Sequence, residues 1–159
     1  MKRDFFRKVG FGLGLDEAGP DDPLAWAQAQ MDAVPPLSWK GDIPSGDTLM
    51  DHYAHWVYTD RKVLREKHKT DRKAYNEARE ELRYETGERF FENLELCIRH
   101  DAALNSGAPV FERLWFFWCN HFAITDKDFM PEFATGAYHR EILRTRMNGS
   151  FTDLVKAAT

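Results

Sequence analysis

The stretch FERLWFFWCNHF, residues 111–122, decides the fold, because beyond Arg113 it is hydrophobic nearly all round. Such a pattern predicts a helix at the centre of a protein rather than on its surface. Pro109, just before it, suits the first turn of a helix, where its missing N–H has no partner to lose. The aromatic residues 115–118 would face all sides of this helix. The sequence therefore predicts that the helix is covered on every side and that the chain does not persist as a compact monomer.

Helical patterns flank this stretch on both sides. Asp22 followed by Pro23 predicts a helix start, because the aspartate side chain can accept hydrogen bonds from the free N–H groups of the first turn. Pro35 and Pro36 end that helix, and a further helix is predicted over residues 137–147. No run of alternating apolar and polar residues predicts a strand. We therefore expect an all-α fold.

Three glycines near the N-terminus, Gly10, Gly12 and Gly14, are spaced like a phosphate-binding loop. No strand is predicted before them and no Gly-Lys-Ser/Thr follows them, as such loops require. We interpret these glycines as a turn-forming connector.

The chain is expected to form a single all-α domain over residues 1–159, built as a helical bundle with one long, highly charged helical arm. Residues 1–46 contain N-terminal helices and a loop, residues 47–89 form the long charged helix, and residues 90–159 form an aromatic-rich helical core. Between residues 60 and 89, 18 of 30 side chains are charged. This part has few apolar residues. They form a narrow stripe, typical of a helix with one partner, with a gap at Asp71.

The charges of this arm divide by sign. From residue 61 to 73 there are seven basic and two acidic residues, and from 77 to 88 there are five acidic and two basic ones. Two arms lying antiparallel would set each basic half against the other's acidic half. Affinity would then come from the apolar residues Val57, Leu64, Tyr75 and Leu82. We therefore expect a homo-oligomer, most simply a dimer, or a complex with another protein; the alternative is a solvated helical face.

Composition limits the other classes of partner. With 22 basic and 26 acidic residues, 22 − 26 gives a net charge of −4, whereas nucleic-acid-binding domains usually carry a strongly basic face. The basic half of the arm also lacks interleaved aromatic residues, so we expect no nucleic acid and no membrane partner. No long uncharged apolar run predicts a transmembrane helix. The two cysteines, Cys97 and Cys119, fit a reducing compartment, and we expect the cytoplasm.

Several blocks of the sequence resemble the domain-of-unknown-function 1800 family. The similar blocks are VGFG (9–12), DPLAW (22–26), FERLWFFWCNHF (111–122), AYHREILR (137–144) and GSFTDL (149–154). Gln30, downstream of the second block, is also similar, whereas Cys119 stands where the usual form has a histidine. The charged middle of the chain is unmatched.

The resemblance implies a helical fold and assigns no reaction, since members of this bacterial family have no established activity. Members are also much longer. The chain is therefore expected to be a truncated member, corresponding to the N-terminal portion of the family.

Candidate binding residues come from the two central blocks: Asn120, His121, Arg140, Glu141 and Arg144. The arginines could form an anion pocket, because guanidinium groups bind carboxylates and phosphates bidentately. Alternatively they form a structural ion-pair network with Glu112, Asn120 or Asp153. Cys119 and His121 are two residues apart and point about 200° apart on a helix, so they cannot bind one ion. We predict that Cys119 packs as an apolar residue and that His121 is buried and hydrogen-bonded.

No metal site is assigned. As a weak alternative, His52 and His55 are three residues apart on one helical face, where two imidazoles can converge on an ion. A third ligand with recognised spacing is missing.

The leading functional hypothesis is a non-catalytic protein–protein interaction or structural module that associates with itself. The rival is an enzyme, or a fragment of one, with a metal or anion site built from His52, His55, His121 and Arg140. No catalytic residue can be assigned and no cofactor is predicted. Whether the protein is an enzyme stays open, and the sequence favours a non-catalytic role.

Overall fold

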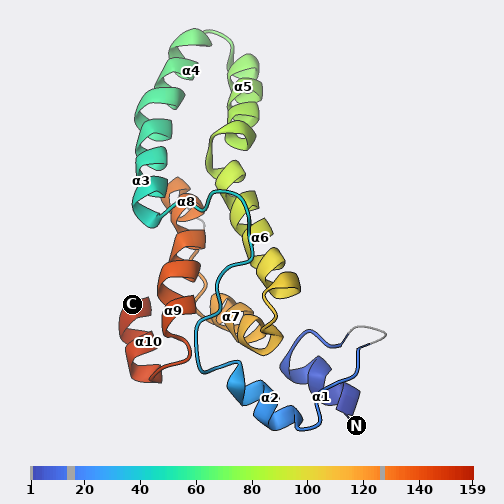
Figure 1. Cartoon of the computed structure of the whole chain (residues 1–159). Coiled ribbons are helices and arrows are strands. Elements are labelled where there is room, and N and C mark those ends of the chain that lie inside the picture. Colours follow the sequence, from blue (N-terminus) through green and yellow to red (C-terminus); the bar gives the residue numbers. More distant parts are fainter. Residues whose placement is uncertain (1, 14–16, 126–127) are drawn as a thin grey trace. The chain divides into compact units, whose positions relative to one another are not determined.

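A computed structural model describes residues 2–13, 17–125 and 128–159 (Figure 1). Every regular element in these residues is a helix, which confirms the all-α prediction. The elements are α1 (Lys2–Val9), α2 (Pro23–Ala29), α3 (Gly46–His55), the π-helical turn η1 (Trp56–Asp60), α4 (Arg61–Lys67), α5 (Arg72–Glu85), α6 (Glu88–Asn105), α7 (Pro109–His121), α8 (Phe129–Ala137), the π-helical turn η2 (Tyr138–Leu143), α9 (Arg144–Arg146) and α10 (Phe151–Ala158). No helix among the described residues is long and apolar enough to cross a bilayer.

The chain forms two compact units, each built from segments that are distant in the sequence. Unit 1 comprises Met1–Gly41, Ile98–Ala123 and His139–Thr159, and unit 2 comprises Asp42–Cys97 and Ile124–Tyr138. Helix α6 therefore contributes its first part to unit 2 and its last part to unit 1. The second and third predicted segments begin at residues 47 and 90, and α3 and α6 begin at Gly46 and Glu88.

Helix α7 provides the centre of unit 1. Phe111, Trp115 and Cys119 are buried along one stripe, because residues four apart lie on the same face of a helix. Within the single chain, α7 is not covered on every side. Phe117 is 54% exposed, and Arg113 is exposed as well, so the helix is amphipathic rather than fully enclosed.

Side chains from the N-terminal segment and from α7 tie unit 1 together. Gln30 Oε1 accepts a hydrogen bond from the free N–H of Val110 at 2.9 Å, in the first turn of α7. Arg113 donates to the carbonyl of Gly10 at 2.6 Å. Gly12 has a φ of 99°, which favours glycine. These contacts agree with the connector interpretation for Gly10 and Gly12; Gly14 lies outside the described residues.

The core of unit 2 is an aromatic cluster contributed by α3, η1, α6 and α8. Its buried members are Leu49, Trp56, Phe91, Phe133 and Ala137. Helices α3 and α8 pack side by side along it. Gly136 allows α8 to approach α6 closely, because a Cβ at that position would lie 1.9 Å from Glu95 Cγ.

The prediction of one long helix over residues 47–89 is wrong. α3, η1 and α4 run on as one continuous helical stretch, but the chain then reverses and α5 returns beside α4 (Figure 1). The two helices form an antiparallel hairpin, which we call the α4–α5 hairpin. Val57 and Leu82, assigned from sequence to a partner chain, pack against the aromatic cluster of their own chain.

The reversal is encoded at the gap in the apolar stripe. His68 leaves the helical conformation with φ −114° and ψ 33°, and Asp71 begins the next helix. The Asp71 carboxylate accepts a hydrogen bond from the N–H of Ala74 at 2.9 Å, as an N-cap residue does.

Candidate functional site

The turn of the α4–α5 hairpin forms an open hollow of about 450 Å³. Its lining residues are Arg65, Glu66, His68, Lys69, Thr70, Arg72 and Tyr75. Three of these side chains are permanent cations and one is a carboxylate. The hollow is therefore a cationic site on a helical hairpin.

Helix α4 positions its arginines over α5. Arg61 and Arg65 are four residues apart and lie on the same helical face, and both donate hydrogen bonds to the Tyr75 hydroxyl. Burial alone would raise the pKa of Tyr75, but these two hydrogen bonds and the positive charges of the two arginines together outweigh it and hold the pKa below the usual value of 10.0. The Arg61 guanidinium also stacks over Trp56 at 5.2 Å and Phe129 at 4.5 Å, measured to the ring centroids. Aromatic rings thus hold Arg61 on the core of unit 2.

Few carboxylates neutralise the cations that line the hollow. In the part of the chain that the structure describes, no ion pair joins Arg65, Lys69 or Arg72 to a carboxylate. The nearby Asp71 carboxylate is used as the helix cap. His68 Nε2 is buried and has no hydrogen-bond partner among the described residues. These groups are available to bind carboxylate or other oxyanions.

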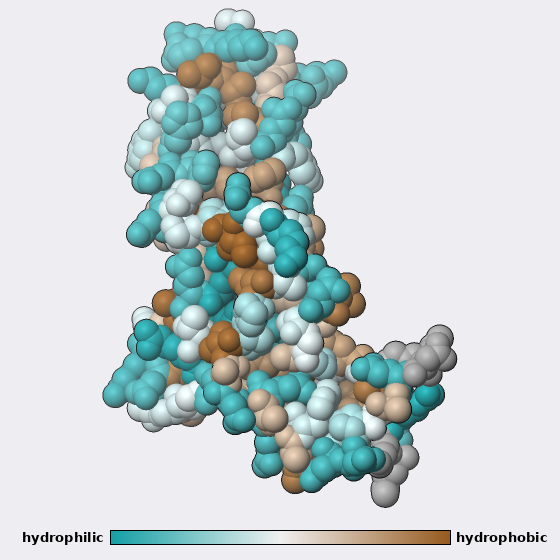
Figure 2. All heavy atoms as spheres, viewed as in Figure 1, coloured by the Kyte–Doolittle hydropathy of each residue, from teal (hydrophilic) through white to brown (hydrophobic). Residues whose placement is uncertain are grey.

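The other half of the hairpin is acidic. Helix α5 carries exposed glutamates towards its C-terminal end: Glu77, Glu80, Glu81 and Glu85. The Lys73–Glu77 ion pair, at 3.8 Å, lies where the basic and acidic parts of α5 meet. Figure 2 shows hydrophilic atoms over most of the visible surface of the hairpin, with apolar patches between them. The basic and acidic stretches that the sequence shows therefore lie along one hairpin.

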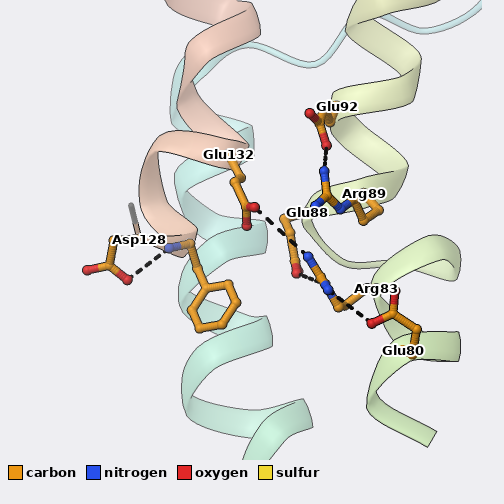
Figure 3. A network of polar contacts seen from close by, with 8 residues as sticks. Glu80, Arg83, Glu88, Arg89, Glu92, Asp128 and Glu132 are labelled. Carbon is orange, nitrogen blue, oxygen red and sulfur yellow. Dashed lines mark hydrogen bonds and ion pairs between the residues drawn. The ribbon is translucent and has the colours of Figure 1, made fainter. Parts of the chain in front are cut away.

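A second charged cluster, built around the buried Glu88, lies where α5, α6 and α8 meet. Arg83 forms ion pairs with Glu88, with Glu80 at 3.0 Å and with Glu132 at 3.9 Å (Figure 3). Glu88 is fully buried. Burial first, and the neighbouring Glu88 second, raise the pKa of Glu132. The cluster joins three helices, which is a structural role.

Arg144 belongs to a buried ion pair rather than to an open pocket. Its guanidinium donates two hydrogen bonds to the Glu112 carboxylate, at 2.5 and 2.8 Å, and one to the Pro35 carbonyl at 3.0 Å. It also stacks over Phe111 and Trp115. The alternative of a structural network is confirmed at Glu112, one of its three predicted partners. With these three hydrogen bonds and two ring contacts the guanidinium is engaged within its own chain, and its side chain is only 3% exposed.

The other four candidate residues are not gathered around Arg144. Arg140 is buried and lies 3.7 Å from the carboxylate of Glu141, which is exposed. Asn120 and His121 are both exposed at the C-terminal end of α7. The prediction that His121 is buried is therefore wrong.

His121 finds its ring contacts on its own helix. Its imidazole stacks on Phe117, four residues earlier, with ring centroids 5.8 Å apart. Such a contact needs no buried polar partner. Cys119, by contrast, is buried as predicted, and burial raises the pKa of its thiol to about 11.

His52 and His55 have separate partners. The His52 ring packs on Phe91, with centroids 4.7 Å apart, whereas His55 Nε2 lies 3.3 Å from Asp60 Oδ1. Among the residues described, no group of three or more His, Cys, Asp or Glu side chains could hold a metal ion.

The sequence did not identify Tyr75 and His68 as members of a site. In the single long helix that it predicted, the two residues lie at different heights along one axis and line no common hollow. The signal that could have found them is Asp71, a helix-capping residue at the gap in the apolar stripe. It missed the buried Glu88 as well, and no local pattern marks that residue.

Comparison with known proteins identifies the family. The model of the family "Protein of unknown function (DUF1800)" matches residues 4–159, including the charged middle that the sequence blocks left unmatched. The chain therefore belongs to this family. No curated protein and no solved structure matches it.

Proposed function

We propose that this member of the DUF1800 family is a non-catalytic interaction module that associates with a second copy of itself through the α4–α5 hairpin. The observation that supports this is the division of charge along the hairpin, with an excess of cations at the turn and exposed glutamates on α5. Two hairpins lying antiparallel bring each basic turn against the acidic part of the other. The contact is isologous, since the same surface of each copy takes part.

Apolar contacts must add to the ion pairs, because an exposed ion pair contributes only about 0.2–1 kcal/mol. Charge then sets register and orientation more than affinity. The stripe expected to supply affinity is used within the chain. Instead the hairpin and the turn η1 expose three large side chains, Tyr58, Val63 and Tyr84. These residues are available to a partner surface.

Charge reversal tests the proposal. One variant carries Arg65→Glu, Lys69→Glu and Lys73→Glu, and the other carries Glu77→Lys, Glu81→Lys and Glu85→Lys. Arg61 is left unchanged because it stacks on the core. The dissociation constant of each variant, measured by light scattering after size exclusion, should rise at least about tenfold. An equimolar mixture of the two should recover association.

A matched control carries Lys8→Glu, Arg146→Glu and Lys156→Glu, three exposed positions in unit 1. It changes the net charge equally and should associate as the parent does. A parent that stays monomeric at micromolar concentration, or a basic-turn variant that associates normally at low and high salt, would contradict the proposal.

A further inference from the structure

We propose that the hollow at the turn of the α4–α5 hairpin is a binding site for a phosphate group, free or carried by a small phosphomonoester. This goes beyond self-association, because the site lies within one hairpin. It concerns four donors: Arg65, His68, Lys69 and Arg72.

The number and kind of donors favour phosphate over a single carboxylate. Two guanidinium groups, an ammonium group and an imidazole nitrogen line the same hollow. A planar carboxylate offers two oxygens, whereas a phosphate monoester or free phosphate offers three or four and carries more charge. Glu66 is the one carboxylate in the lining, and it leaves the balance of charge positive.

Two details indicate that the donors are held ready. Arg65 donates a hydrogen bond to Tyr75, another residue of the lining. This bond holds the guanidinium group at the hollow. His68 Nε2 is buried in the turn without a hydrogen-bond partner among the described residues. A buried polar atom of this kind is costly unless it is satisfied, and a turn of the ring towards an anion oxygen in the hollow would give it the partner that it lacks.

The size of the hollow points to a ligand larger than the free ion. A volume of about 450 Å³ lies within the range of sites for small organic molecules. The open side of the hollow can accept the organic part of an ester, while the cations hold the phosphate.

The test is a titration of the full chain, followed by the amide signals of residues 65–75 in proton–nitrogen NMR spectra. The probes are inorganic phosphate, glycerol phosphate and, at matched ionic strength, sodium chloride. Saturable shifts with a phosphate probe, absent with chloride, are expected. Saturation by inorganic phosphate indicates a site for the free ion, and clearly tighter binding of glycerol phosphate indicates a site for an ester.

Matched variants locate the site. Lys69→Gln with Arg72→Gln removes two charges from the lining, at side chains for which no hydrogen bond or ion pair is seen in the described chain. Lys62→Gln with Lys67→Gln removes two exposed charges from the same hairpin outside the lining. The first pair should weaken phosphate binding about tenfold or more, and the second by no more than about twofold.

If both pairs of substitutions weaken phosphate binding equally, the binding is general attraction to positive charge and the proposal is wrong. Chemical shifts that do not saturate with phosphate would also contradict it. The titration is repeated on the variant Glu77→Gln, Glu81→Gln, Glu85→Gln, which lacks the acidic part needed for self-association. Unchanged phosphate binding is expected there. Loss of self-association with phosphate binding retained would separate the two proposals.

Discussion

Two arginines, the buried Arg144 in unit 1 and the partly buried Arg83 in unit 2, hold carboxylates in different ways. Arg144 in unit 1 faces one carboxylate, that of Glu112, and the two groups satisfy each other through two hydrogen bonds. Arg83 in unit 2 is shared among Glu80, Glu88 and Glu132. The first arrangement is a neutral pair, whereas the second carries excess negative charge.

The two arrangements differ in how many buried carboxylate oxygens lack a hydrogen-bond partner. Glu88 and Glu132 each keep one buried carboxylate oxygen without a hydrogen-bond partner among the described residues. The Glu112–Arg144 pair leaves no such atom. A buried neutral pair fixes the packing at any pH near neutrality, whereas a buried acidic excess makes packing depend on protons.

The largest effect is expected from breaking the neutral pair. Glu112→Ala leaves the Arg144 charge buried without its counter-ion, and removing one partner of such a pair typically costs about 3–5 kcal/mol of unfolding free energy. Urea denaturation measures the loss, and hydrogen exchange should place it in unit 1. As a control, the double variant Glu112→Leu with Arg144→Met should cost much less, because no charge remains buried. A double variant as damaged as Glu112→Ala would contradict this account.

A smaller, pH-dependent effect is expected from Arg83→Met. The substitution leaves Glu88 buried without its cation, at a cost of about 2–4 kcal/mol at pH 7. The cost should shrink at pH 5, because the substitution also removes a cation beside Glu132, whose already raised pKa then rises further, so that this carboxyl group takes up a proton as the pH falls. Stability measured at both pH values checks this. Arg89→Met, which breaks the more exposed pair with Glu92, is the control and should change stability little at either pH. An equal cost at pH 5 and pH 7 for Arg83→Met would be the contrary result.

The smallest effect, and one of opposite sign, is expected from Glu132→Gln. The pKa of Glu132 is raised above 4.5 in the folded state, so the folded state binds its proton more tightly than the unfolded chain does. The carboxyl group therefore contributes most stability below about pH 4.5, and that contribution is lost as pH rises through the raised pKa. Removing the charge should stabilise the protein by about 0.5 kcal/mol at pH 7, with the gain vanishing towards pH 4.5. A variant less stable than the parent at pH 7 would show that the pair with Arg83 outweighs the acidic excess.

The sequence predicts the helices wherever local signals agree. Asp22 caps α2 as expected, by accepting hydrogen bonds from the N–H groups of Leu24 and Ala25. The start of α7 at Pro109 was also predicted. These features depend on residues within one turn of a helix, so a single sequence is enough to find them.

The hairpin was missed because charged residues are good helix formers and no glycine or proline interrupts residues 61–85. The only signal is Asp71, which is as compatible with a helix surface as with an N-cap. The buried Glu88 depends on Arg83 and on Glu132, which is distant in the sequence. Contacts of that range are fixed by packing and have no local pattern.

The π-helical turn η1 sets the rotational phase of the hairpin. A π-helical turn is wider than an α-helical one, and α3, η1 and α4 continue into each other without a break. Each residue of an α-helix rotates the chain by about 100°. Deleting one of the residues between Trp56 and Arg61 would turn the bond from the Arg61 N–H to the Trp56 carbonyl into an ordinary α-helical one, so regular winding would return and the hairpin would keep its direction. The same deletion within α4 would instead turn the residues after it by about 100° relative to Trp56, so η1 is a place where the chain can lose a residue without re-aiming the hairpin.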